Sequence, residues 1–419
     1  MPSASKSSLL QTDRDAANPQ QGDATAPAFP WFIVGVGTWF TAVGMQSVLF
    51  SWLVVGVLHA KAEWVGIAQS ALMLPSVLLM LVGGAVADRH DRRTLLIGLH
   101  LLASVLSTCL VVIVANGWLS LSILIVYALL MGTIQAFVMP ARDSLLSEVA
   151  GPNLTRAVAS MTLTQWGMQA LGALVAGTAR WIGTVPALGL HALTLLVGVP
   201  TLRRLPPAPP RSGVPQHSLR FSDIVEGIRE VAQSPVLPSL VVLVAAVGAL
   251  FIGPFLVVFP ILIRDYYGGD VGQLALLNMA FPLGTILGSV AIVWRGRLRR
   301  KGIAQLVALL AGAGCLGVIS FGLPLWGTLT AVCGWGVGAA VFVSAGRTVF
   351  QEQARPSHRA RVLSVYMLGF MGTAGLIGAP LSGVLVEQIG PLATCAAAGG
   401  TMVIVVILAW LCTGVARVE

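Results

Sequence analysis

The sequence predicts an all-α membrane protein whose twelve transmembrane helices form two pseudo-symmetric six-helix bundles. Charged residues make up only 10 % of the 419 residues, whereas soluble domains contain about 25 %. The mean hydropathy is +0.87, and the few charges lie between long uncharged intervals. A helix needs about 20 apolar residues to cross the hydrocarbon core of a bilayer. The uncharged intervals are long enough for this.

Ten uncharged intervals account for the twelve predicted helices, because the two longest each hold two. The intervals are 24–60, 64–87, 94–141, 157–179, 181–202, 231–263, 271–294, 302–346, 362–386 and 388–416. Asn116-Gly117 interrupts one long interval, and Gly322 with Pro324 interrupts the other; such residues stop helices. The short alternating segments of a transmembrane β-barrel are absent from the sequence.

A linker divides the chain into two halves. The stretch "RRLPPAPPRSGVPQ" is too proline-rich for a helix, and apolar residues at helical spacing follow it from Phe221 to Val231. We expect this amphipathic helix to lie against the inner membrane surface or the bundle. The predicted parts are a mobile cytoplasmic tail at 1–30, bundles at 31–202 and 236–416, and the linker at 203–235.

The distribution of positive charge predicts the orientation in the membrane. Of the 25 Lys and Arg residues, only Lys61, Arg180 and Arg264 lie in loops that follow odd-numbered helices. The positive-inside rule therefore places the other loops and both termini in the cytoplasm. The net charge of +9 is explained by the anionic inner leaflet and requires no nucleic acid.

The two halves repeat each other at an offset of about 205 residues. "PARDSLLSEVAGPNLTRAVAS" corresponds to "AGRTVFQEQARPSHRARVLSV", and Arg142 and Arg156 have the same spacing as Arg347 and Arg361. Both halves begin on the same side of the membrane, so the repeat is parallel. Parallel repeats are typical of transporters whose substrate site lies between the halves.

From about Trp31 onward, the chain resembles the major facilitator superfamily. The signature loop of that family, between its second and third helices, has the form G-x-x-x-D-[RK]-x-G-[RK]-[RK]. Here it reads Gly84, Asp88, Arg89, Arg92 and Arg93, with Asp91 where glycine is usual. "MPARDSLLSEV" and "LTRAVAS" resemble the branch of macrolide-efflux and enterobactin-type siderophore exporters. The arginine common in the fourth helix of drug antiporters is missing from "LSILIVYALLMGTIQAF".

This resemblance implies a bacterial inner-membrane protein with a charged latch between the halves. Asp88 meets the negative end of its helix dipole and therefore needs a compensating partner. In the family's arrangement that partner is the start of helix eleven. The gating candidates are Asp88, Arg89, Asp91, Arg92, Arg142, Arg347 and Arg361. The alternative is that these residues are solvated charges that set topology, with helix-end arginines reaching the headgroups.

The middle of every predicted helix lacks Asp and Glu. A proton-coupled pump usually keeps a titratable group inside the bundle. His100 and His191 are the remaining coupling candidates, since histidine titrates near neutrality. The alternatives are that both are neutral buried histidines, that Asp88 or an acid at an outer helix end carries the proton, or that the protein is an uncoupled facilitator.

The same lack of acids disfavours cationic substrates and favours neutral, zwitterionic or anionic amphipathic ones. Polar and aromatic residues inside the helices are the candidate cavity lining. They are Thr38, Thr41, Gln46, Gln135, Gln165, Gln169, Asn278 and Tyr366. Hydrogen bonding between helices is the alternative role for each.

Together these features predict a secondary transporter that exports an amphipathic organic solute, siderophore or drug-like, by alternating access, with protons as a coupling ion. The first alternative is an importer or facilitator of a siderophore or metabolite. A lipid scramblase or a non-transporting membrane scaffold is an alternative from another functional class. The single cysteines and histidines form no nucleophile–base pair or metal motif, so we expect no enzyme activity, metal or cofactor. The fold requires only a monomer.

Overall fold

The structure is a computed structural model that describes residues 28–150, 154–208, 221–234, 236–296, 300–353 and 359–417. These residues are helical and contain no strand. Most of the predicted tail at 1–30 lies outside them, and so does the proline-rich part of the linker. The first helix begins at Phe29, two residues before the predicted start of the first bundle.

The N-terminal half contains six long helices and one short one within the described residues. Their bounds are α1 Phe29–Trp52, α2 Ala62–Arg89, α3 Arg92–Ala115, α4 Leu121–Val149, α5 Leu154–Gly177, α6 Ala179–Ile182 and α7 Thr184–Arg203. A π-helical turn, Leu53–Val57, continues α1. In the linker, α8 spans Phe221–Gln233.

The C-terminal half repeats this pattern with more interrupted helices. Their bounds are α9 Leu237–Val247, α10 Gly253–Ile261, α11 Val271–Arg295, α12 Lys301–Ile319, α13 Leu325–Gln353, α14 Arg359–Met367 and α15 Ala379–Cys412. Two π-helical turns make α9 and α10 one continuous segment up to Tyr266, and two more join α14 to α15. A break at Gly390 divides α15: the part before it completes a membrane-length segment with α14, Val362–Ile389, and the part after it forms another, Pro391–Cys412.

Eleven segments of the described chain are long and apolar enough to cross a membrane. All twelve predicted segments are helical, and the one that does not meet the apolar criterion is α5. This helix carries Gln165 and Gln169 in its middle and packs between α1 of its own half and α11 of the other. Its polar residues therefore lie inside the protein, at the boundary between the halves.

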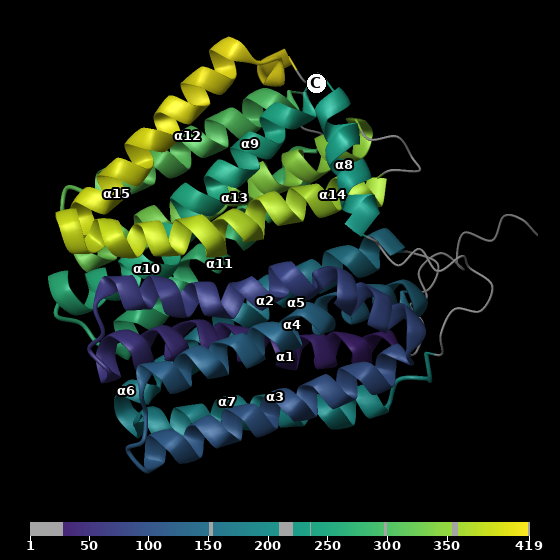
Figure 1. The fold of residues 1–419 in the computed structure, drawn as a ribbon, viewed down its shortest axis with the longest axis vertical. Helices are drawn as coiled ribbons and strands as arrows, with labels where there is room; N and C mark the ends of the chain where they lie inside the picture. The colour runs from purple at the N-terminus through teal and green to yellow at the C-terminus, as the bar shows by residue number, and fades with distance from the viewer. Residues whose placement is uncertain are drawn as a thin grey trace, which may run out of the picture.

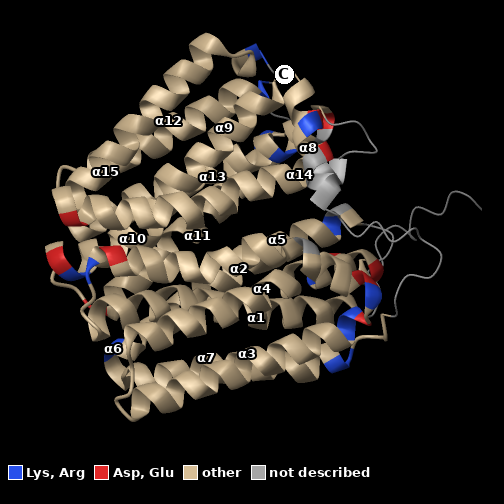
Figure 2. Ribbon diagram, in the orientation of Figure 1, with Lys and Arg blue, Asp and Glu red and all other residues tan. Residues whose placement is uncertain are grey.

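Figure 1 shows the two halves one above the other, with α3 and α7 along the lower edge and α12 and α15 toward the upper edge. Helices α2 and α5 adjoin the C-terminal half. Figure 2 shows that charged residues gather at the two ends of the bundle, whereas the ribbon between them is almost free of charge. We call the end with α8 and the start of α3 the linker end, and the other the opposite end.

Glycine residues let the backbones of neighbouring helices pack in direct contact. A Cβ atom on Gly132 of α4 would lie 2.2 Å from the carbonyl oxygen of Leu72 in α2. In the other half, a Cβ on Gly284 of α11 would lie 1.9 Å from the carbonyl oxygen of Cys333 in α13. Both pairs join the second and fourth long segments of a half. The repeat seen in the sequence is therefore also a repeat in packing, as small residues at membrane helix interfaces allow.

The interrupted segments of the C-terminal half lie against each other. A Cβ on Gly253 would lie 2.2 Å from the carbonyl carbon of Gly378, which ends the second π-helical turn before α15. Such turns commonly occur at functional sites in helices. The small-residue run at 372–383 therefore combines close helix contact with π-helical turns.

Helix α8 packs against α14 and α9 of the C-terminal half (Figure 1). This agrees with the expectation that the amphipathic linker helix lies against the bundle. Val231 is buried in this contact, whereas Ile228 is 50 % exposed.

We expect Gly172→Ala to destabilise the protein by about 1–3 kcal/mol, as overpacking typically does. A Cβ at this position in α5 would lie only 2.0 Å from the carbonyl oxygen of Thr41. The control is Gly167→Ala in the same helix, where a Cβ meets nothing within 4 Å. The apparent melting temperature in detergent should fall for the first variant and not for the second; equal melting temperatures would contradict the packing.

Candidate functional site

At the opposite end, an arginine of the C-terminal half binds the loop between α1 and α2. Arg264 donates from Nη1 to the carbonyl oxygens of Val55 and Ala60, both at 3.1 Å. Its Nη2 donates to Asp265 at 2.8 Å, which holds the guanidinium in place. The contact therefore joins the end of the continuous α9–α10 segment to the first loop of the other half.

Two further polar contacts close this end between the halves. The backbone N–H of Ala62, at the start of α2, donates to Glu387 Oε1 of α15 at 2.6 Å. A carboxylate at a helix N-terminus is favoured by the helix dipole. Arg180, after α5, lies 3.5 Å from Asp270, the N-cap of α11. Glycine contacts between α2 and α15 support the closure, since a Cβ on Gly66 would lie 2.5 Å from a backbone oxygen of α15.

At the linker end, the described ion pairs join helices of the same half. Arg92 of α3 is 0 % exposed and lies 2.6 Å from Glu148 of α4. Lys301 of α12 lies 2.6 Å from Glu352 of α13. The polar contacts between the halves described above lie at the opposite end.

The predicted gating residues are distributed over this linker end. Asp88 is half-buried at the end of α2, and Arg89 beside it is exposed. Arg347 is exposed on α13, and Arg361 lies on α14, where its side chain is outside the described part of the structure. The proposed latch between Asp88 and the start of helix eleven stays a prediction.

Asp91, the residue that replaces the usual glycine, has a well-defined structural role. It is the N-cap of α3, where its carboxylate accepts from the backbone N–H of Thr94 at 2.7 Å. The other carboxylate oxygen accepts from the N–H of Ala208 in the linker at 2.9 Å. The N–H of Arg92 donates back to the Ala208 carbonyl oxygen at 3.1 Å. Asp91 therefore ties the start of the linker to the start of α3.

Partial burial of Asp91 would raise its pKa, but other interactions outweigh this effect. Hydrogen bonds from Thr94 and Ala208, together with the positive charge of Arg93, lower the pKa of this carboxyl below its ordinary value. The carboxylate is therefore ionised, and the tie is intact, throughout the neutral range.

The predicted cavity residues differ in their surroundings. In α1, Thr38 donates to the Gly35 carbonyl oxygen and Thr41 to that of Gly37, both at 2.8 Å. These bonds lie within one helix, so they differ from the bonds between helices that were the expected alternative. Asn278 likewise donates to the Leu274 carbonyl oxygen at 3.0 Å.

The other predicted cavity residues lack such bonds within the described chain. Gln46 is 4 % exposed and its Nε2 has no partner there. Gln135, Gln165 and Gln169 are half-buried. Tyr366 is 2 % exposed, meets Phe350 edge to face and stacks on Phe370, so in this conformation it lies inside the C-terminal half.

A cluster of aromatic rings lies where the halves meet, and sequence reasoning missed it. Trp335 of α13 is at its centre, with four phenylalanine rings at centroid distances of 5.2–6.2 Å. These rings belong to Phe251, Phe255, Phe259 and Phe281. Trp166 of α5 contacts Phe281 at 6.5 Å from the other half. We call these six residues the aromatic cluster.

The aromatic cluster combines buried and accessible rings. Trp335 is 4 % exposed and Phe259 0 %, whereas Phe255, Phe281 and Trp166 are half-buried. Most pairs meet edge to face, the arrangement preferred by aromatic quadrupoles. The cluster is therefore an apolar contact between the halves.

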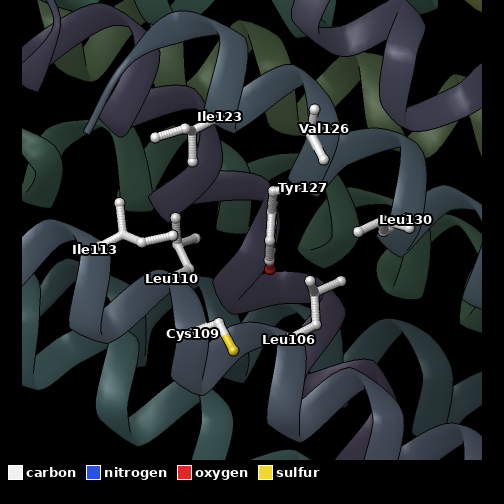
Figure 3. A pocket seen from close by; sticks show the side chains of 8 residues that line it. All are labelled: Leu106, Cys109, Leu110, Ile113, Ile123, Val126, Tyr127 and Leu130. Atoms are coloured by element: carbon white, nitrogen blue, oxygen red, sulfur yellow. The ribbon is translucent and has the colours of Figure 1, made fainter. Parts of the chain in front are cut away.

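A separate apolar pocket between α3 and α4 does not belong to this site. Its volume, measured as the space that the centre of a water-sized sphere can reach, is about 90 Å³. Figure 3 labels the lining side chains, which are aliphatic except for Cys109 and Tyr127. Helix α3 lies at the edge of the N-terminal half, away from the other half (Figure 1).

No group of three metal-ligating residues is found among the residues that the structure describes. All five cysteines are free thiols, of which Cys395 is buried.

The fold and these contacts define a class of protein: a multi-pass membrane transporter built from two repeated helical halves. The family model "Major Facilitator Superfamily" matches residues 32–368 and, in an overlapping match, 255–418. The chain belongs to this superfamily. Its relatives indicate a bacterial membrane protein.

Curated relatives of this chain are exporters. It is 30 % identical over 393 residues to the multidrug efflux pump Tap of Mycobacterium tuberculosis, covering 87 % of this chain and 89 % of the relative. It is 28 % identical over 347 residues to the enterobactin exporter EntS of Shigella flexneri, covering 78 % of each. It is 24 % identical over 361 residues to macrolide efflux protein A of Streptococcus pyogenes, covering 79 % and 81 %.

Solved structures share the fold at low identity. The nucleoside transporter NupG has a TM-score of 0.73 at 13 % identity, covering 91 % of this chain and 98 % of that one. The POT family transporter PepTSo has a TM-score of 0.72 at 13 % identity, covering 94 % and 98 %. These similarities confirm the predicted fold and do not bear on the substrate.

We expect Asp91→Asn to remove a pH-dependent part of the stability. Because the pKa of Asp91 is lowered in the folded protein, its contribution is present above the unfolded pKa of about 3.9 and is lost as pH falls through the folded value. The wild type should therefore melt at a higher temperature than the variant at pH 7, and the difference should shrink toward pH 3.5. A difference that is constant with pH would contradict this role.

We expect Arg264→Ala to open the opposite end. The substitution removes both bonds to the α1–α2 loop, and hydrogen bonds from charged groups contribute about 1.5–3 kcal/mol each. Cysteine labelling near Ala62 should become at least several-fold faster. The control is Arg295→Ala, an exposed arginine at the linker end, which should leave labelling unchanged. Unchanged labelling in Arg264→Ala would show that these bonds do not hold the end closed.

Proposed function

We propose that this protein is a secondary transporter that exports an amphipathic organic solute, siderophore or drug-like, by alternating access. The observation that carries this proposal is the asymmetry of its two ends. Described polar contacts cross between the halves at the opposite end, and the described ion pairs at the linker end stay within a half. A transporter that alternates between two states needs an end that closes in each.

The positive-inside distribution supports the linker end as the cytoplasmic end. The protein would then face the cytoplasm in this conformation, ready to take up a solute for export. The relatives named as exporters and efflux pumps support this direction.

The aromatic cluster supports a solute with a substantial apolar or ring-bearing part. Aromatic contacts contribute about 0.5–1.5 kcal/mol each beyond burial of area. The half-buried rings of Trp166 and Phe281 come from different halves. A solute held between them would therefore be contacted by both halves, which move relative to each other during transport. The lack of acids in the middle of the helices supports a solute without a fixed positive charge.

The experiment is expression in a bacterial host that lacks its own efflux pumps, with retention of radiolabelled erythromycin and of enterobactin measured separately. We expect lower retention of at least one compound and matching resistance or secretion. Higher accumulation would indicate an importer. Unchanged retention across a wider panel of siderophores and drugs would contradict the proposal.

We expect Trp166→Leu to raise the KM for export about tenfold, because one ring contact between solute and the N-terminal half is lost. The control is Trp326→Leu, since this residue of α13 is 73 % exposed and outside the cluster. Melting temperature verifies folding in both variants. Equal KM values for Trp166→Leu and wild type would contradict a contact between the aromatic cluster and the solute.

A further inference from the structure

A small cavity lies inside the N-terminal half, near the linker end. It is lined by residues of α1, α3, α4 and α7, among them Trp39, His100 and Arg142. Its volume, measured in the same way, is about 10 Å³. A cavity of this size holds one water molecule when polar partners are present. The other lining side chains are apolar.

Two buried polar atoms among the lining residues lack a partner within the described chain. Arg142 is 6 % exposed; its Nε and Nη2 donate to Asp143, and its Nη1 has no partner. His100 is 2 % exposed; its Nδ1 lies 2.8 Å from the carbonyl oxygen of Leu96, and its Nε2 has no partner. Leaving such an atom unpaired costs about 1–3 kcal/mol.

The chemistry of these two atoms is complementary through one water molecule. Arg142 Nη1 is a donor. The Leu96 carbonyl can only accept, so Nδ1 of a neutral His100 carries the hydrogen and Nε2 carries a lone pair. Water can accept from the guanidinium and donate to Nε2 at the same time. Neither a cation nor an anion satisfies both atoms in this way.

We propose that one water molecule binds between Arg142 and His100, and that His100 is the proton-accepting group of the transport cycle. This inference rests on the proposed function, which it deepens by naming the coupling residue. The step adds one proton to Nε2 through the water. Nδ1 keeps its hydrogen, which stays hydrogen-bonded to the Leu96 carbonyl oxygen. It changes Nε2 from an acceptor into a donor and the ring into a cation.

Protonation would disfavour the conformation seen here. The water would then meet two donors and could no longer donate to Nε2. Two positive groups would also share that cavity, since Arg142 is the only other charged residue that lines it. The lining residues of α1 and α7 are uncharged. A low pH should therefore shift the population toward the state in which the opposite end is open.

The structure also separates the two candidate histidines. His191 of α7 is equally buried, 2 % exposed, with its Nε2 unpartnered in the described chain, but it does not line this cavity.

The test is His100→Gln, which keeps a polar amide at this position and cannot take up a proton. Distances between spin labels across the opposite end would be measured in nanodiscs without added solute, between pH 8 and pH 5. In the wild type we expect the open fraction to rise at least threefold over this range, because a histidine that leaves its buried site when the opposite end opens titrates within it. In His100→Gln the fraction should stay constant. In the control His191→Gln it should rise as in the wild type.

A structure at high resolution would test the water directly, with density between Arg142 Nη1 and His100 Nε2 expected. Absence of this density, or a pH response that survives in His100→Gln, would overturn the proposal. If His100→Gln fails to fold, His100→Asn gives the same test with a smaller side chain. Lack of export in the retention assay, with the pH response intact, would contradict the proposed function and leave the role of His100 standing.

Discussion

The structure depends on the exclusion of charge from its lipid-covered length. Unpaired charges are costly in a bilayer, so the described acids of the membrane-spanning helices lie near the ends of the spans. There Glu148 and Glu352 meet basic side chains, and Glu387 meets a helix N-terminus. With charge confined to two ends, those ends can serve as gates. Arg264 and Glu387 join the halves at one end, while Arg92 stabilises a single half at the other.

Two kinds of contact hold the molecule together between these ends. Glycine contacts such as that of Gly172 with Thr41 bring helix backbones together within a half, and the repeat makes them similar in both halves. Between the halves, the aromatic cluster supplies an apolar contact through Trp166 and Phe281. Apolar contacts have little directional preference, so they would be remade readily if the halves rock as proposed. The directional hydrogen bonds between the halves lie at the opposite end, which opens in the proposed cycle.

The sequence predicted the twelve helical segments and the two halves, because helix length and charge exclusion are properties of local sequence. It did not predict the pairing of Arg264 with the α1–α2 loop, since positions more than 200 residues apart carry no local signal of contact. The aromatic cluster had a partial signal in the four-residue spacing of Phe251, Phe255 and Phe259. The role of Asp91 was also hidden, because its second partner, Ala208, lies in the linker.

The central claim is that the halves alternate between two states, of which this structure shows the one closed at the opposite end. The most direct measurement is single-molecule energy transfer in nanodiscs, with one dye pair across each end of the wild-type protein. The account predicts anticorrelated distances, so that the linker end closes when the opposite end opens. A single fixed distance at both ends, or ends that open together, would contradict it.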